Sequence, residues 1–167
     1  MGTRIAIPVE EYLHTSFPDL DREYWDGELL ERTLPDTLHA KVQSLLIVFF
    51  WLLRKRLAIF PYAEARMRLG SNRFLIPDVA VFYGAEPARV PDTPPLIAIE
   101  ILSPDDKMTA VREKLEEYKR WGVPHSWLID PNSRRLYTCD AGLTEVTTLQ
   151  VPELDIELRP SDIFDWD

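Results

Sequence analysis

The segment LIAIEIL, residues 96–102, is apolar at every position except Glu100. Side chains of a β-strand alternate between two faces, so the three isoleucines share one face while Ala98 and Glu100 share the other. Because both faces are apolar, the pattern predicts a strand buried on both sides, as in the centre of a sheet that helices cover. The segment therefore indicates an α/β or α+β fold.

Elements of both kinds flank this central strand. Apolar periodicity together with capping and stop signals predicts helices at residues 9–14, 37–57 and 106–121. Alternating patterns and turn residues predict strands within residues 24–30, 62–69, 74–83, 125–130, 134–139 and 143–149. We expect one domain over residues 1–167, in which a mixed central sheet is flanked by helices and carries additional β-hairpins. Residues 1–20 are expected to form an N-terminal arm and residues 153–167 an acidic C-terminal tail.

Two acids stand where a buried apolar side chain is expected. Glu100 lies in the central strand, and Asp78 shares a strand face with Ile76 and Ala80 in the segment 74–83. A buried, unpaired carboxylate is costly, and a hard cation such as Mg²⁺ binds carboxylate oxygens together with several waters. Two inward acids on adjacent strands therefore favour a divalent-cation site. The alternative is that each acid pairs with a buried arginine, such as Arg66 or Arg68.

Two lysines occur in the helix predicted after the central strand. At helical spacing, Lys114 borders the apolar stripe that includes Leu115 and Tyr118. Its stem can lie on the sheet while its ammonium group reaches a nearby site. Lys107 occupies the same border two turns earlier. The simpler interpretation of either lysine is a side chain whose charged end reaches solvent at the helix margin.

The composition describes an ordinary globular chain that belongs to a reducing compartment. The 167 residues are 46% hydrophobic and 28% charged, and the single cysteine is Cys139. One thiol excludes an internal disulfide framework, and no histidine pair stands at zinc-ligand spacing. The longest apolar run, residues 45–53, has nine residues, whereas a spanning helix needs about 20. Without a membrane span or a signal-peptide stretch, we expect a cytoplasmic protein with no membrane partner.

The net charge of −9 argues against a generally basic, nucleic-acid-binding surface. The acidity is concentrated at the two ends of the chain. Residues 1–36 contain nine acids and three bases, and residues 153–167 contain six acids and one base. The central residues 37–152 contain 13 acids and 15 bases, a net charge of +2. The central segment can therefore still face a phosphate backbone.

The pattern of these residues resembles the PD-(D/E)XK nuclease superfamily, and more specifically the Uma-two family of bacterial restriction endonucleases. The similarity extends over residues 20–160. The matching stretches are Tyr24-Trp25-Asp26-Gly27-Glu28-Leu29, His39, Pro77-Asp78-Val79-Ala80-Val81, Glu100-Ile101-Leu102-Ser103-Pro104, Lys114 with Tyr118, Gly122-Val123 and Trp127-Leu128-Ile129-Asp130-Pro131. The chain departs from the broad superfamily pattern at Leu102, where a lysine is usual. In the Uma-two pattern the lysine is on the following helix and corresponds to Lys114.

The resemblance implies a Mg²⁺- or Mn²⁺-dependent endonuclease that hydrolyses phosphodiester bonds, with DNA as the expected partner. Asp78, Glu100 and the Ile101 carbonyl would hold the metal ion. Lys114 would orient the attacking water or offset negative charge, with Lys107 as a possible substitute. If a lysine acted as the base, its pKa would have to lie well below the usual value of about 10.4.

The resemblance implies further roles that the residues alone leave open. Glu31 or Glu28 would supply an additional carboxylate, and an exposed hairpin acid is an equally good interpretation. Tyr118 would contact phosphate or simply pack. His39 resembles the family's histidine, although its place on the first turn of a helix favours a solvent-facing or capping role. By analogy with nucleases of this fold, a homodimer could form through exposed apolar residues of the first hairpin, namely Tyr24, Trp25 and Leu29.

Two other classes of protein compete with the nuclease interpretation. A nuclease fold kept as a catalytically inactive binding module would account for the displaced lysine and the acidic ends. A hydrolase of small phosphoesters would use the same metal chemistry, but the six glycines form no nucleotide-binding loop. The lack of a G-x-S-x-G turn argues against a serine hydrolase.

Overall fold

The structure is a computed structural model that describes residues 6–18 and 21–166. Its largest sheet contains, in spatial order, β10 (Leu143–Val146), β9 (Arg135–Cys139), β8 (His125–Asp130), β7 (Ile97–Ile101), β6 (Val79–Tyr83) and β3 (Ile59–Ala63). Strand β7 pairs parallel with β8 and antiparallel with β6, so the sheet is mixed. All five residues of β7 are buried. The prediction of a central strand in a mixed sheet is confirmed.

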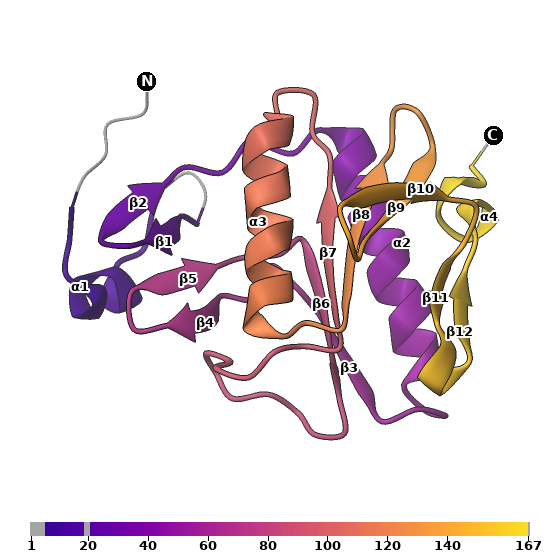
Figure 1. Cartoon of the computed structure of the whole chain (residues 1–167), viewed down its shortest axis with the longest axis horizontal. Coiled ribbons are helices and arrows are strands. Elements are labelled where there is room, and N and C mark those ends of the chain that lie inside the picture. The colour runs from indigo at the N-terminus through magenta and orange to yellow at the C-terminus, as the bar shows by residue number, and fades with distance from the viewer. Residues whose placement is uncertain (1–5, 19–20, 167) are drawn as a thin grey trace.

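Two helices cover opposite faces of this sheet (Figure 1). Helix α2 (Thr37–Leu53) packs Val42, Leu46 and Phe50 against the face that carries the three isoleucines of β7. Helix α3 (Met108–Trp121) packs Leu115 and Tyr118 against the face that carries Ala98. The period-two assignment of the faces of β7 is therefore confirmed. Glu100 belongs to the face beneath α3.

A smaller sheet carries the N-terminal part of the chain. Its strands, in the order β2 (Glu28–Leu30), β1 (Glu23–Trp25), β5 (Arg73–Leu75) and β4 (Met67–Gly70), are all antiparallel. The predicted hairpin at residues 24–30 is confirmed. Asp26 and Gly27 form its turn with φ values of 51° and 95°, which suits a two-residue hairpin turn.

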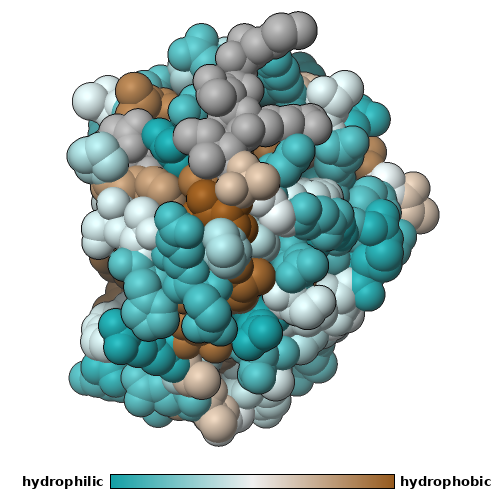
Figure 2. Space-filling model, turned by 90° about the vertical axis from the view of Figure 1, so that its left-hand side faces the viewer, coloured by the Kyte–Doolittle hydropathy of each residue, from teal (hydrophilic) through white to brown (hydrophobic). Residues whose placement is uncertain are grey.

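The first hairpin does not expose the apolar residues that we expected at a dimer interface. Tyr24 and Leu29 are buried in a cluster with Tyr12 and Phe74, because helix α1 (Val9–His14) covers them. Trp25 is half-buried, and the Arg73 guanidinium lies 4.5 Å above its ring. The face of the molecule that carries α1 and the small sheet is largely hydrophilic, with a narrow band of hydrophobic residues (Figure 2). The predicted exposure of Tyr24 and Leu29 is therefore wrong.

Two predicted strands are each divided between the two sheets. Residues 62–69 contain the end of β3 and most of β4, and they separate near Glu64, whose φ is 52°. Residues 74–83 contain β5 and β6, which separate at Ile76-Pro77-Asp78. Pro77 has no N–H for a strand ladder, and the break leaves the backbone of Ile76 free to bond elsewhere. The predicted hairpin is confirmed, because β4 pairs antiparallel with β5 and β3 with β6, but its division between two sheets was not predicted.

Other predicted boundaries also shift. Helix α2 ends at Leu53 rather than at residue 57, and α3 begins at Met108. The strand predicted at 143–149 is divided into β10 and β11 (Leu149–Val151). The predicted acidic tail instead forms the short 3₁₀ helix η1 (Pro152–Leu154), β12 (Ile156–Leu158) and α4 (Pro160–Phe164). Its apolar residues, among them Ile156 and Phe164, are buried in the core beneath α2.

Among the residues that the structure describes, no helix is both long and apolar enough to cross a membrane.

Candidate metal and phosphodiester site

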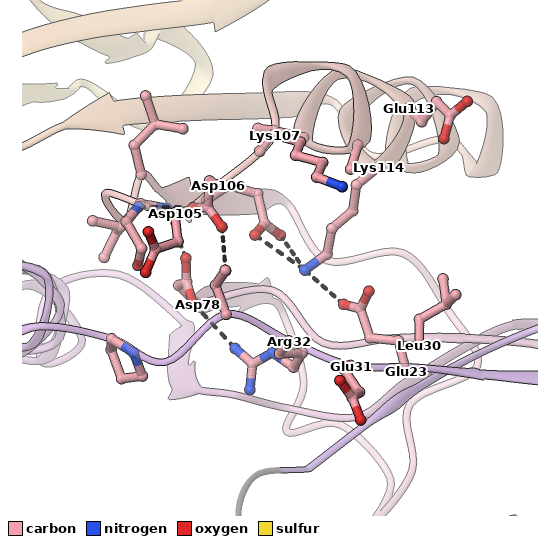
Figure 3. Close-up of a pocket in the computed structure, with 18 of the residues that line it drawn as sticks. Glu23, Leu30, Glu31, Arg32, Asp78, Asp105, Asp106, Lys107, Glu113 and Lys114 are labelled. Carbon is pink, nitrogen blue, oxygen red and sulfur yellow. Dashed lines mark hydrogen bonds and ion pairs between the residues drawn. The ribbon is translucent and has the colours of Figure 1, made fainter. Parts of the chain in front are cut away.

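The two acids predicted from strand periodicity lie opposite each other at one end of the central sheet. The β6–β7 ladder pairs Val79 with Ile99, so one residue further along Asp78 stands across from Glu100. The exposed fractions are 5% for Asp78 and 8% for Glu100. Both acids line a cavity of about 770 Å³ between the small sheet and the N-terminal ends of α2 and α3 (Figure 3). Ile101 also lines this cavity.

Three donors fix the carboxylate of Asp78. The Ile101 backbone N–H donates to Oδ2 over 2.7 Å, and His39 Nε2 lies 3.2 Å from the same oxygen. Arg32 Nη2 donates to Oδ1 over 3.2 Å. Burial alone raises the pKa of Asp78, but the hydrogen bond and charge of His39, with the charge of Lys114, outweigh burial and lower this pKa. Asp78 is therefore ionised and held in one orientation.

Glu100 is held from the side of α3. The Tyr118 hydroxyl donates to its Oε1 over 2.7 Å, and the Lys114 ammonium lies 3.0 Å from both carboxylate oxygens. Burial raises the pKa of Glu100 to about 8, and the negative charges of Asp78 and Glu23 add to this rise against the opposing effect of Lys114. Burial and the neighbouring acids therefore favour the protonated form of Glu100 in the absence of a further cation.

Lys114 reaches across the cavity to a third buried carboxylate. Its Nζ lies 2.6 Å from Glu23 Oε1 (Figure 3). It also donates to the Ile76 carbonyl over 2.7 Å. Burial lowers the pKa of Lys114, but the charges of Glu100 and Glu23 raise it above its usual value overall. The two carboxylates favour the protonated form of this lysine, which argues against a role as general base. Its contacts suit a fixed positive charge.

The oxygen donors at this point fit a hard divalent cation. Asp78, Glu100 and Ile101 line the same cavity, and Mg²⁺ takes one or two carboxylates and keeps several waters. The pKa of Glu100 is raised mainly by burial, and a cation bound beside it would favour its ionised form. Within residues 6–18 and 21–166, no three His, Cys, Asp or Glu side chains are placed to hold one ion. A site here would therefore consist of two carboxylates, a carbonyl and water.

The comparisons with known proteins give this geometry its context. The Uma2 family model, described as "Putative restriction endonuclease", matches residues 9–167. The chain belongs to the Uma2 family. A solved structure described as "a putative nuclease belonging to DUF820", from Anabaena variabilis ATCC 29413, superposes with a TM-score of 0.82 at 24% identity. The match covers 96% of this chain and 98% of that one, so the two share their fold. No curated protein matches the chain.

Several residues named from the sequence meet at the centre of the Uma2 fold, whereas others lie around its edge. Glu100 contacts both Lys114 and Tyr118. Asp78 lies across from Glu100, where the charge of Lys114 acts on it. Glu31 lines the cavity, but its side chain is 67% exposed and pairs with Arg22. Glu28 and Lys107 also line the cavity, and Lys107 is the N-cap residue of α3.

His39 is buried, so the solvent-facing role predicted for it is wrong. Its exposed fraction is 4%, and its ring points at Asp78 rather than at water. His39, Val42, Leu46 and Phe50 lie at helical spacing on the buried face of α2. That spacing was visible in the sequence and would have placed His39 on the inner face. The Asp36 side chain is the N-cap and accepts from the His39 backbone N–H over 2.8 Å.

Two further residues of the centre were missed in the sequence. Glu23 is buried at the start of β1, where its Oε1 accepts the Ile76 N–H over 2.9 Å as well as contacting Lys114. Arg32 follows β2 and pairs with Asp78. A three-residue strand and an irregular segment give too little periodicity to locate either residue.

The predicted alternative was that a buried arginine pairs with each acid. Asp78 does pair with a mostly buried arginine, but this arginine is neither Arg66 nor Arg68. Arg32 supplies this partner. Arg66 instead pairs with Asp21, and Arg68 donates to the Gly70 carbonyl.

Proposed function

We propose that this Uma2 chain is a Mg²⁺- or Mn²⁺-dependent endonuclease that hydrolyses phosphodiester bonds, with DNA as its substrate. One observation carries the proposal. Two buried carboxylates from paired strands face a cavity beside a permanently charged lysine, in a family described as restriction endonucleases. Acidic oxygens for a metal ion and a fixed cation for a phosphate group are the requirements of this chemistry.

Each residue of the proposed metal site has a separate role. Asp78, Glu100 and the Ile101 carbonyl would hold the ion, which when bound lowers the pKa of a water and offsets charge on the phosphoryl oxygens. Arg32 and His39 keep Asp78 ionised and oriented. Lys114 is protonated, so it orients water or offsets charge as phosphate oxygens become more negative, while another group or bulk water takes the proton.

Tyr118 and Glu23 act through these groups. The Tyr118 hydroxyl fixes one oxygen of Glu100. Glu23 fixes Lys114 from the side opposite Glu100, and the Ile76 carbonyl takes a third direction of the ammonium group. The catalytic lysine of our proposal is therefore supported by a strand of the small sheet as well as by its own helix.

A second function, as a catalytically inactive binding module, is favoured by one specific observation. Ten acids but only three lysines and arginines line the cavity, so the acids outnumber these bases by seven. Such a cavity repels a polyanion unless metal ions reduce its charge. The two functions therefore differ in whether the cavity binds divalent metal ions.

Calorimetry and a cleavage assay test the proposal together. We expect Mn²⁺ to bind the wild-type protein, and Asp78→Ala or Glu100→Ala to abolish binding. Glu113→Gln is the matched control, because Glu113 lines the same cavity without contacting either acid in the described structure. We expect supercoiled DNA to be cut in Mg²⁺ or Mn²⁺ by the wild type and by the control only. Metal binding that survives both alanine substitutions would disprove the assigned site.

A further inference from the structure

The C-terminal end of α2 and the loop after it form the most basic part of the chain. Residues 37–63 contain four lysines and arginines and no acid, in a protein whose net charge is −9. Three of these bases, Arg54-Lys55-Arg56, are consecutive and exposed. None of the three forms an ion pair within the part of the chain that the structure describes. Their charge is therefore available to a partner.

Aromatic and apolar side chains lie beside these bases. Trp51 is 52% exposed, and the Arg54 guanidinium lies 3.8 Å from the centre of its ring. Leu52 is 72% exposed on the next position of the helix. Tyr83 is 56% exposed at the end of β6, and it pairs with Ile59, three residues after the basic run. Its odd-numbered position in β6 places it on the face of the sheet that α2 covers, with Val79 and Val81.

We propose that these six residues, which we term the α2-end surface, anchor an unpaired strand of nucleic acid outside the cavity. The α2-end surface consists of Trp51, Leu52, Arg54, Lys55, Arg56 and Tyr83. Proteins that hold single strands combine bases for the backbone with exposed aromatic rings on which nucleobases stack. An arginine whose guanidinium lies 3.8 Å from the centre of the Trp51 ring fits this arrangement, and a duplex has no free base face to offer.

The position of the surface complements the candidate active site. The cavity is strongly acidic and draws little affinity from a phosphate backbone. His39 lines the cavity near the start of α2, and Arg54 follows 15 residues later, about 22 Å along the helix axis. A basic anchor at this distance would supply the binding energy that the cavity lacks.

An anionic membrane also presents phosphate groups that could bind these three bases. The structure favours nucleic acid over a membrane as the partner. Helices that lie in a membrane surface present a long, free apolar face. The inner face of α2 is buried in the core by Val42, Leu46 and Phe50. The large apolar side chains that the described part of α2 exposes are Val48, Trp51 and Leu52, which span little more than one turn. The bases, in contrast, are consecutive and unpaired.

Binding without metal tests the proposal separately from cleavage, although the expected ligand class rests on the proposed function. The probe is a fluorescent oligothymidine of about 12 nucleotides in EDTA, measured by anisotropy, beside a duplex of equal length. We expect the wild type to bind the single strand more tightly. The triple variant Arg54→Ala, Lys55→Ala, Arg56→Ala should reduce the slope of log Kd against log salt by about 2.

Two controls distinguish the effect of where the three bases lie from the effect of the protein's total charge. Arg89→Ala, Arg112→Ala, Arg135→Ala removes the same charge from exposed sites elsewhere and should keep the slope. Trp51→Ala should weaken single-strand binding about five- to hundredfold and duplex binding less, whereas Leu52→Ala should change either by less than about threefold. Thermal unfolding of each exposed-site variant checks that it folds.

Several results would overturn the proposal. Equal losses in the two triple variants would show that only net charge matters. Binding to phosphatidylserine vesicles that needs the three bases, without oligothymidine binding, would assign the surface to a membrane. A concentration-dependent dimer lost in Leu52→Ala would assign it to a second copy of the chain. Strand binding in a protein that neither binds metal nor cuts DNA would instead refute only the proposed function.

Discussion

At the scale of single residues, the sequence identified acids and a lysine but not the partners that hold them. Asp78 and Glu100 stood out because a carboxylate in an apolar strand violates the pattern around it. Glu23 gave no such signal, since it begins a three-residue strand beside a polar turn. Only the fold brings Glu23 within 2.6 Å of Lys114, 91 positions later in the chain. Long-range ion pairs leave no trace in local periodicity.

The buried position of Lys114 leads to a prediction about stability. Lys114→Met removes the cation shared by Glu23 and Glu100, and leaving buried carboxylates without a partner should cost about 3 kcal/mol. Lys107→Met, at the exposed start of α3, should change the free energy of unfolding by less than about 0.5 kcal/mol. Urea denaturation measures both values. Similar losses in the two variants would contradict the contacts assigned to Lys114.

A second residue-scale prediction concerns the single thiol. Cys139 is buried beside Glu116, and burial, followed by the negative charge of that glutamate, raises the pKa of the thiol. Because the thiolate is the reactive form, the native protein at pH 8 should react with iodoacetamide far more slowly than the urea-unfolded chain. Glu116→Gln should accelerate the native reaction by lowering the pKa. Equal native and unfolded rates would show that the thiol is accessible.

At the scale of elements, periodicity located the helices and the central strand but not the sheet to which each short strand belongs. The alternation of residues 62–69 and 74–83 is real, yet it continues across breaks at Glu64 and at Pro77. Alternation with a period of two indicates on which face of a sheet each side chain lies. It does not indicate where the chain leaves one sheet and begins to pair with a strand of another. That break matters for the site, because it places Asp78 at the entrance to β6 instead of within a strand.

The end of α3 offers a prediction at the same scale. Gly122 terminates the helix with φ of 103°, a left-handed conformation that side chains with a Cβ rarely adopt. Gly122→Ala should therefore destabilise the protein by about 1 kcal/mol. Gly70→Ala is the control, because a Cβ there meets no atom within 4 Å and the φ is not positive. Thermal unfolding compares the two variants, and an equal shift in Tm would exclude strain at Gly122 as the cause.

At the scale of the whole molecule, the charge of −9 is distributed in a way that the sequence predicted only in part. The acidic ends of the chain were evident, but the C-terminal one is folded against α2 rather than free. The N-terminal acids contribute Glu23, Glu28 and Glu31 to the cavity. The central basic residues are divided as well, since Lys114 is buried whereas Arg54-Lys55-Arg56 are exposed. One molecule therefore combines an acidic cavity with a basic end of α2.

Because the cavity is acidic and the bases lie at the end of α2, we expect acids at the edge of the cavity to weaken substrate binding. Glu31 and Asp105 line the cavity and are exposed, so their charges repel phosphates near the mouth at low salt. The double variant Glu31→Gln, Asp105→Asn should tighten binding of a labelled oligonucleotide in EDTA about two- to fivefold, and the gain should fade as salt screens the charges. The control Glu145→Gln, Asp155→Asn removes equal charge from β10 and from the turn after η1, where asparagine tolerates the left-handed φ of Asp155. If both double variants tighten binding equally, the repulsion belongs to the net charge of the protein and not to its cavity.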